Sequence, residues 1–284
     1  MEVKRINHKN VCQIRSYDLS DKKASYIVYP DIEKTKIVNH AFSTRSGGVS
    51  TGYYAEMNVS FTRGDEQQHV LENYRRIARI MQCSVEDFVC SDQTHTTNVR
   101  KVTRLDKGKG VVRKKDYSDV DGLITNESGI CLATFYADCV PLYFVDPVNH
   151  AIGLSHSGWR GTVNRMGKVT LEAMQREYGT KPENVICAIG PSICQSCYEV
   201  SEDVALAFLN TFGDLGNEML RAIGNGKYLL NLHFVNQYIL LEQGVKQENI
   251  SVTDICTCCN PDFLYSHRRA GDKRGNLGAF LMLK

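Results

Sequence analysis

The sequence predicts an α+β fold with mixed β-sheets. Apolar runs of strand length outnumber the helical segments, and several follow one another with no helix between them. A doubly wound parallel sheet would instead alternate strands with helices. Hydrophobic residues make up 42% of the 284 residues and charged residues 23%, which is typical of a globular protein with a sizeable core. We find no internal repeat or linker, so we expect one domain over residues 36–284 after a peripheral N-terminal segment, residues 1–35.

Runs of apolar, β-branched and aromatic residues between turn residues predict the strands. In chain order these runs are residues 26–29, 37–42, 88–90, 98–102, 122–125, 130–135, 142–145, 151–154, 184–189 and 277–283. A polar, glycine-bearing loop follows the second run and extends to Asn58.

Helical spacing of apolar residues predicts a helix over residues 65–81, with Asp65 as its N-cap. Further helices are expected over residues 162–178, 202–212 and 232–241, the last of them capped by Asn231. The span 107–115, rich in Lys, Arg and Gly, is predicted to be a mobile surface loop. Its alternative role is to attract an anionic substrate.

Charge and cysteine content narrow the class of protein. The net charge of +2 gives no argument for nucleic acid or an anionic membrane as partner. No apolar run approaches the roughly 20 residues that span a bilayer, and the first residues lack a signal-peptide hydrophobic region. Eleven cysteines without a secretory signal indicate reduced thiols rather than a disulfide framework. We therefore expect a cytoplasmic protein.

Cys139 and His156 stand at the ends of two neighbouring predicted strands, with a turn at 146–149 between them. If the two strands pair antiparallel, the thiol and the imidazole meet at the same edge of the sheet. Gly158 and Gly161 flank Trp159-Arg160 and allow close approach of the backbone there. This pattern is typical of a functional site.

His95 has a comparable local setting, in a polar stretch between two predicted strands. Two imidazoles and one thiolate, from His95, His156 and Cys139, form a three-ligand zinc set with a fourth position open to water or substrate. Because the three residues are far apart in sequence, their spacing alone leaves open the alternative of separate buried side chains.

Two Cys-x-x-Cys pairs stand later in the chain, Cys194 with Cys197 and Cys256 with Cys259. Such pairs suggest a structural zinc with four thiolates. The segment between them is far longer than the roughly 15–20 residues of a zinc ribbon and carries two predicted helices. The sequence therefore favours small buried thiols, Cys258 included, near the active cleft.

Charged residues near glycine-rich turns are candidates for ligand binding. Arg45 and Arg160 adjoin such turns, where a guanidinium and backbone N–H groups can bind phosphate together. Asp138 and Asp121 are candidates for positioning a ligand hydroxyl or orienting a metal-bound imidazole. For Asp121, the favoured interpretation is an ordinary turn residue with a structural role only.

Several short motifs occur in a fixed order. They are Phe42-Ser43-Thr44-Arg45-x-Gly47-Gly48-Val49-Ser50 with Asn58, Gln93-x-His95, Asp121-Gly122, Ala137-Asp138-Cys139-Val140-Pro141, His156-x-Gly158-Trp159-Arg160-Gly161, Gly190-Pro191-Ser192-Ile193 with Cys197-Tyr198-Glu199-Val200, and Ser266-x-Arg268-Arg269. Together, from Phe42 onward, they resemble the YfiH/YlmD-like purine nucleoside phosphorylases, long labelled multicopper polyphenol oxidases or laccase-domain proteins.

The resemblance implies a single catalytic domain with an α/β sandwich of mixed β-sheets and outer helices, similar in outline to a toxin deamidase that uses a Cys–His pair. It implies zinc bound by His95, Cys139 and His156. The activity it implies is phosphorolysis of adenosine, inosine and methylthioadenosine, with a side activity that deaminates adenosine.

The expected site follows from that chemistry. Zinc would orient or polarise substrate or phosphate, Arg45 and Arg160 would clamp the phosphate, and Asn58 and Asp138 would contact substrate. The sequence departs from the family pattern at Thr96, at His267 and around Arg274. These departures affect substrate preference more than metal binding.

Three alternatives stay open. A copper-dependent polyphenol oxidase is disfavoured because none of the eight histidines forms the His-x-His pairs of a trinuclear copper centre, although copper can occupy a nitrogen and sulfur site adventitiously. A metal-free hydrolase or deamidase would use Cys139 as nucleophile and His156 as base. A non-enzymatic protein that keeps the fold is the third. We expect a monomer or small homo-oligomer.

Overall fold

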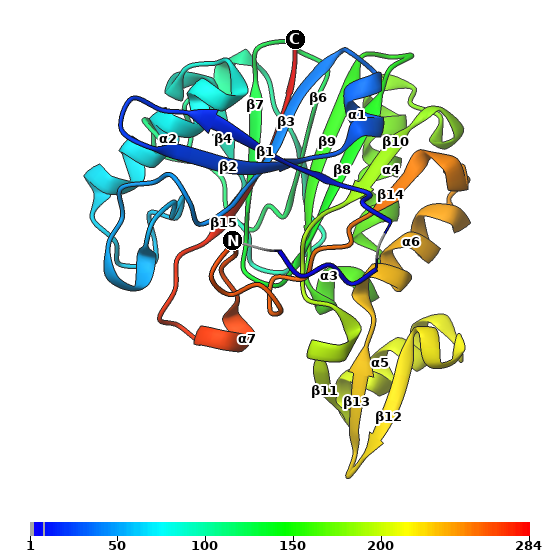
Figure 1. Ribbon diagram of the computed structural model, residues 1–284. Coiled ribbons are helices and arrows are strands. Elements are labelled where there is room, and N and C mark those ends of the chain that lie inside the picture. The colour runs from blue at the N-terminus through cyan, green and yellow to red at the C-terminus, as the bar shows by residue number, and fades with distance from the viewer. Residues whose placement is uncertain (1–2, 8) are drawn as a thin grey trace.

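The computed structural model describes residues 3–7 and 9–284, and its centre is a pair of six-stranded sheets packed face to face (Figure 1). Helix α2 (Gln67–Met81) covers the outer face of the first sheet. Helices α4 (Met166–Tyr178) and α6 (Leu232–Glu242) cover the outer face of the second. The predicted sandwich of mixed sheets with outer helices is confirmed.

The first sheet has the strand order β1–β2–β3–β15–β7–β4. Neighbouring strands are antiparallel except β7 and β4, which are parallel. The strands are β1 (Gln13–Asp18), β2 (Lys23–Val28), β3 (Val38–Ser43), β15 (Leu277–Leu283), β7 (Cys131–Tyr136) and β4 (Phe88–Cys90).

The second sheet has the order β14–β10–β8–β9–β6–β5. Its central strands are antiparallel, and the outermost strand on each side runs parallel to its neighbour. The strands are β14 (Ile250–Val252), β10 (Ile186–Ile189), β8 (Val140–Asp146), β9 (Ala151–Ser157), β6 (Gly122–Thr125) and β5 (Val99–Lys101).

Strands β8 and β9 are buried on both faces, which explains their continuous apolar sequence. Successive side chains point to opposite faces of a strand. Tyr143 and Ile152 therefore join the core between the sheets, while Phe144 and Ala151 pack with the outer helices. These two strands form the rigid frame of the functional site.

A small third sheet extends from the sandwich together with helix α5 (Figure 1). Its strands are β11 (Glu199–Ser201), β13 (Lys227–Leu230) and β12 (Leu220–Gly224). The short helices are α1 (Pro30–Lys34), α3 (Trp159–Val163) and α7 (His267–Ala270), and α5 spans Glu202–Phe212. Among the helices of the described residues, none has the combined length and apolarity needed to span a membrane.

Two helix predictions need correction. The helix expected over 162–178 is two helices, α3 and α4, because Arg165 between them takes a left-handed conformation with φ of 60°. The N-cap of α2 is Glu66 rather than Asp65. The Asp65 carboxylate instead accepts hydrogen bonds from the side chains of Ser50 and Asn58. Asn231 is confirmed as the N-cap of α6, where it accepts a bond from the backbone of that helix.

The loop at 107–115 is not a free surface loop. Lys109 is buried between the carboxylates of Asp106 and Asp116. Gly110 lies so close to Cys90 that an added Cβ would come within 2.5 Å of the Cys90 Cβ. The loop is therefore anchored through Lys109 and Gly110, while Val112, Arg113 and Lys114 are exposed as a surface loop would be, and its mobility stays a prediction.

The N-terminal segment, predicted as peripheral, continues the first sheet with β1 and β2. Strand β1 is largely exposed, whereas β2 buries Ala24, Ile27 and Val28. The division into residues 1–35 and a domain over 36–284 stays a prediction.

Candidate functional site

Three side chains predicted as zinc ligands converge at one edge of the second sheet. Cys139 directly precedes β8, and His156 lies on β9, where it is paired with Pro141 in the antiparallel register. His95 comes from the loop after β4. The three ligand atoms lie within 4.8 Å of one another, and Cys139 Sγ is 3.9 Å from His95 Nε2. The expected antiparallel pairing therefore brings Cys139 and His156 together, and the loop after β4 adds His95.

Asp121 holds the loop that carries His95. Its carboxylate accepts hydrogen bonds from the backbone N–H groups of Thr94, His95 and Thr96. His95 takes a left-handed φ of 66°, and Asp138, next to Cys139, has a φ of 95°. Such conformations are costly for residues with a side chain and persist where surrounding contacts impose them. The backbone is thus constrained on both sides of the site.

The same carboxylate orients His156. Nδ1 of the imidazole lies 2.7 Å from Asp121 Oδ1, and both residues are buried. Burial by itself opposes a charged imidazole, but the Cys139 sulfur and Asp121 outweigh it and raise the pKa of His156 to about 9. Because Nδ1 is engaged by Asp121, Nε2 is the nitrogen left for the site.

Cys139 is a thiol that ionises easily. Its burial opposes ionisation, yet the adjacent His156 and His95 outweigh that effect and lower the pKa of the thiol to about 6. Gly158 packs against both ligands: an added Cβ would lie 3.0 Å from Cys139 Sγ and 3.0 Å from His95 Cδ2. A larger residue at this position would therefore press on two of the three candidate ligands.

This donor set fits a metal ion. A readily formed thiolate and two imidazole nitrogens match the N/S ligands of tetrahedral zinc, and three protein ligands leave one position free. Asp121 provides the second hydrogen bond that metal-ligating histidines usually make. The site is thus a candidate metal centre with His95, Cys139 and His156 as ligands.

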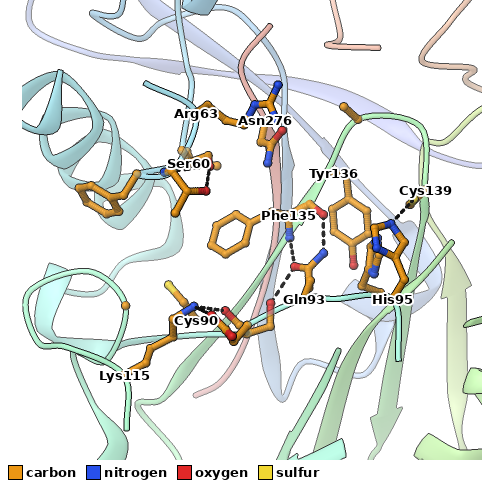
Figure 2. A pocket seen from close by; sticks show the side chains of 18 of the residues that line it. Ser60, Arg63, Cys90, Gln93, His95, Lys115, Phe135, Tyr136, Cys139 and Asn276 are labelled. Atoms are coloured by element: carbon orange, nitrogen blue, oxygen red, sulfur yellow. Dashed lines mark hydrogen bonds and ion pairs between the residues drawn. The ribbon is translucent and has the colours of Figure 1, made fainter. Parts of the chain in front are cut away.

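A cavity opens directly over the triplet (Figure 2). Its volume is about 410 Å³, and an adjoining cavity of about 370 Å³ shares His95 and Cys139 in its lining. Gln93, Phe135 and Lys115 line the first cavity. Trp159, Ile193, Tyr198 and Leu232 give the second an apolar wall. Each volume lies within the range of small-molecule sites.

Two arginines stand where the cavities meet. Arg63 and Arg274 line both of them. Burial lowers the pKa of Arg274, and the positive charge of Arg63 lowers it further. Within the part of the chain that the structure describes, the Nε atoms of both guanidiniums are buried without a hydrogen-bond partner. Two neighbouring guanidiniums at the wall of a cavity are candidates for binding an anion.

The predicted substrate-binding residues divide into two groups. Arg160 and Asp138 line the second cavity, where the Arg160 guanidinium lies 4.3 Å from the centre of the Trp159 ring. Asp138 accepts hydrogen bonds from Thr257 Oγ1 and from the backbone of Arg268. It therefore lies at the cavity with both oxygens engaged.

Arg45 and Asn58 are not among the residues that line these cavities. Arg45 donates to the carbonyls of Ala55 and Pro261 and lies over the ring of Tyr265. Asn58 is fully buried, and its amide bonds to Asp65 and to the backbone of Ser60 and Asn276. The structure gives both residues partners within the loop framework.

Sequence reasoning missed Arg63 and favoured a turn role for Asp121. Arg63 follows no motif, and its site position depends on Asp272, a residue remote in sequence that accepts from its guanidinium. The signal for Asp121 was its place directly before a buried strand that neighbours the strand of His156.

Comparison with a family model and with characterised relatives gives a consistent assignment. The model described as multi-copper polyphenol oxidoreductase laccase matches residues 39–284. The purine nucleoside phosphorylase YlmD of Bacillus subtilis is 36% identical over 259 residues, which cover 89% of this chain and 91% of that protein. A protein from an unknown prokaryotic organism, named adenosine deaminase RL5, is 32% identical over 83% of this chain and 90% of its own length.

Solved structures agree. The crystal structure of YlmD from Geobacillus stearothermophilus superposes with a TM-score of 0.86 and 31% identity, covering 96% of this chain and all of that one (100%). Sequence, fold and ordered motifs thus point the same way, and the chain belongs to the laccase-domain family that includes the purine nucleoside phosphorylase YlmD.

Proposed function

We propose that the protein is a zinc-dependent purine nucleoside phosphorylase, which converts a purine nucleoside and phosphate into the free base and ribose-1-phosphate. The observation that carries the proposal is the position of Arg63 and Arg274. Both arginines line the two adjoining cavities that His95 and Cys139 of the candidate metal group also line. Relatives that carry this name include YlmD of Bacillus subtilis.

Zinc is the proposed metal because its usual ligands are thiolate and imidazole. His95, Cys139 and His156 would hold it, and when bound it would supply a Lewis acid that polarises an oxygen of substrate or phosphate. Asp121 keeps His156 in the tautomer and orientation that such a ligand needs. Copper is the alternative metal that the family description names.

Arg63 and Arg274 are the proposed phosphate ligands, in place of a clamp by Arg45. Both line the two cavities, and their adjacent positive charges suit a dianion. Lys115 lines the same cavity, but its ammonium already pairs with Asp92. Binding there removes phosphate from bulk water and fixes it beside the sugar, which contributes to the rate by proximity and orientation.

The purine would lie on the apolar wall formed by Trp159, Ile193 and Tyr198. Aromatic and aliphatic side chains give a flat base large contact area. Arg160 lies over the Trp159 ring at the rim of this wall, free to meet ligand atoms. In the reaction a phosphate oxygen bonds to the anomeric carbon, the electron pair of the ribose–base bond goes to the purine, and the purine takes up a proton.

Purified protein of measured metal content, incubated with a panel of purine nucleosides with and without phosphate, tests this proposal. Phosphate-dependent release of free base with ribose-1-phosphate supports it, provided that Cys139→Ala, folded by circular dichroism, loses the activity. Base release that does not depend on phosphate, or full activity in the Cys139→Ala variant, would contradict it.

Deamination is the second candidate activity, favoured by the relative named adenosine deaminase RL5. A metal-free variant of the idea uses the thiolate of Cys139 and the imidazolium of His156, an ion pair that the pKa shifts of both groups favour. Formation of inosine from adenosine measures deamination. Activity that survives chelation would assign it to the thiol, and activity restored only by zinc would assign it to the metal.

A further inference from the structure

Two Cys-x-x-Cys loops meet beside the second sheet and form a group that shares no residue with His95, Cys139 and His156. One follows β10 and carries Cys194 and Cys197, and the other follows β14 and carries Cys256 and Cys259. Strands β10 and β14 are parallel neighbours, so their loops leave the sheet at the same edge. The long intervening segment therefore does not separate the thiols, contrary to the sequence argument.

The backbone joins these loops to each other. Ser192 and Cys256 form a parallel β-bridge, and the N–H of Thr257 donates to the carbonyl of Ser192. The N–H of Cys194 donates to the sulfur of Cys256 at 3.2 Å. This contact fixes the Cys256 sulfur against the loop that carries Cys194 and Cys197.

The sulfur atoms have the spacing of metal ligands. All four Sγ atoms lie within 4.8 Å of one another. The Sγ of Cys259 lies 3.5 Å from that of Cys197 and 4.0 Å from that of Cys194. Four sulfurs around a tetrahedral zinc, each at about 2.3 Å, are about 3.8 Å apart.

The pattern differs from that of disulfide pairs. A disulfide joins one sulfur to one other, whereas Cys259 has two sulfur neighbours at similar distances. Cys258, between the ligand candidates, is buried but does not belong to the group. The distances between the sulfur atoms and the exclusion of Cys258 both match a four-ligand site.

The surroundings suit a closed structural site. Cys194 and Cys256 are buried and pack with Ile193 in a small apolar cluster. Zinc with four thiolates carries a net charge of about −2. Arg269 donates to the carbonyl of Cys258 and Arg268 lies over the Tyr198 ring, so two positive charges are close by.

We propose that Cys194, Cys197, Cys256 and Cys259 bind one structural zinc ion, separate from the metal of the active site. All four positions are filled by protein, so this ion has no place for substrate. It ties together the loops that hold Asp138: Thr257 Oγ1 donates to the Asp138 carboxylate at 2.6 Å, and the N–H of Ile193 donates to its carbonyl. The ion thereby supports the residue next to Cys139.

Metal counting with Cys139→Ala separates the two sites. Protein purified with reductant should contain two zinc ions per chain in the wild type, one for each group, and one in Cys139→Ala. X-ray absorption of the zinc left in Cys139→Ala should give four sulfur neighbours at about 2.3 Å. Failure of phosphorolysis with this signal intact would overturn the proposed function alone.

Variants of the ligands complete the test. Cys197→Ser and Cys259→Ser should each lose one zinc ion per chain and melt at a lower temperature, while Cys258→Ser, the matched control, should keep both ions. Zinc absent from Cys139→Ala, a spectrum dominated by nitrogen neighbours, or disulfides among these four cysteines in wild-type protein would overturn the proposal. If the serine variants fail to fold, native mass spectrometry and X-ray absorption of Cys139→Ala still decide.

Discussion

His156 and Asp121 are joined twice: Nδ1 of the imidazole lies 2.7 Å from the carboxylate Oδ1, and the backbone N–H of His156 donates to the carbonyl of Asp121 at 2.8 Å. The backbone bond lies at the edge of the sheet and fixes the position of the His156 backbone, from which the ring extends. The first sets which nitrogen faces Cys139. One acidic residue thus contacts both the backbone and the ring of a candidate metal ligand.

Replacing Asp121 with Asn should weaken metal binding by roughly 10–100-fold and lower kcat with it. An amide N–H in place of the carboxylate favours the tautomer with its proton on Nε2, the nitrogen needed by the metal. Zinc affinity, measured by competition with a chelator, checks this. Asp119→Asn is the matched control, since Asp119 is exposed and bonds to Thr94 rather than His156. Equal affinity in both variants would contradict the role given to Asp121.

Gly158→Ala should disturb the metal site without unfolding the protein. The new Cβ would lie 3.0 Å from both Cys139 Sγ and His95 Cδ2, so the ligands must move apart. We expect kcat/KM to fall roughly tenfold or more. Gly161→Ala is the control, because its Cβ would meet no atom closer than 3.5 Å. Zinc content, circular dichroism and kinetics distinguish the two, and equal kinetics would refute the steric argument.

Arg274→Ala should raise the KM for phosphate by roughly 10–100-fold, the effect of losing a hydrogen bond to a charged group. The KM for the nucleoside should change much less if Arg274 contacts phosphate alone. Arg79→Ala provides the comparison, since Arg79 is an exposed arginine on α2. Initial rates over a matrix of phosphate and nucleoside concentrations separate the two constants. A change confined to the KM for the nucleoside would contradict the placement of the phosphate at Arg274.

Acid should destabilise the protein partly through His40. Burial, aided by the charge of Arg15, lowers the pKa of this imidazole to about 3, and its Nε2 accepts the N–H of Tyr29. The unfolded chain binds this proton below about pH 6.5 and the folded chain only near about pH 3, so the contribution is complete above about pH 6.5 and declines as pH falls between them.

His40→Gln should reduce the loss of unfolding free energy between about pH 7 and about pH 4 by ~2–3 kcal/mol. Urea unfolding of both proteins at the two pH values measures it, and groups common to both cancel in the difference. His150→Asn serves as control because His150 is exposed. A pH dependence identical to that of the wild type would show that His40 is not buried in its neutral form.

The proximity of Cys139 and His156, two of the three candidate metal ligands, could be predicted from local sequence. Cys139 and His156 stand at the ends of adjacent strands joined by a short turn, so pairing alone brings them together. The break at Arg165 could not be predicted, since its left-handed conformation interrupts an apolar pattern that continues on both sides. The spacing of apolar residues indicates which face of a helix is buried, but it does not indicate whether the helix is continuous.

The proposed anion site and the thiol cluster depend on contacts that local patterns do not contain. Arg63 and Arg274 come together only because their loops meet over the cavity. The two Cys-x-x-Cys loops come together because β14 returns beside β10 after a long excursion. Both arrangements follow from the order of strands in the sheets. The sequence predicts the fold class but not this order.

The place of β15 has a consequence for synthesis of the protein. This strand, Leu277–Leu283, lies between β3 and β7, so the facing edges of these two strands stay open until β15 has been synthesised and has paired with them. Nascent chains arrested before residue 277 are expected to be digested by protease along their length, and completed chains to resist it. Until then, the facing edges of β3 and β7 lack their native neighbour and are open to pairing with other strands.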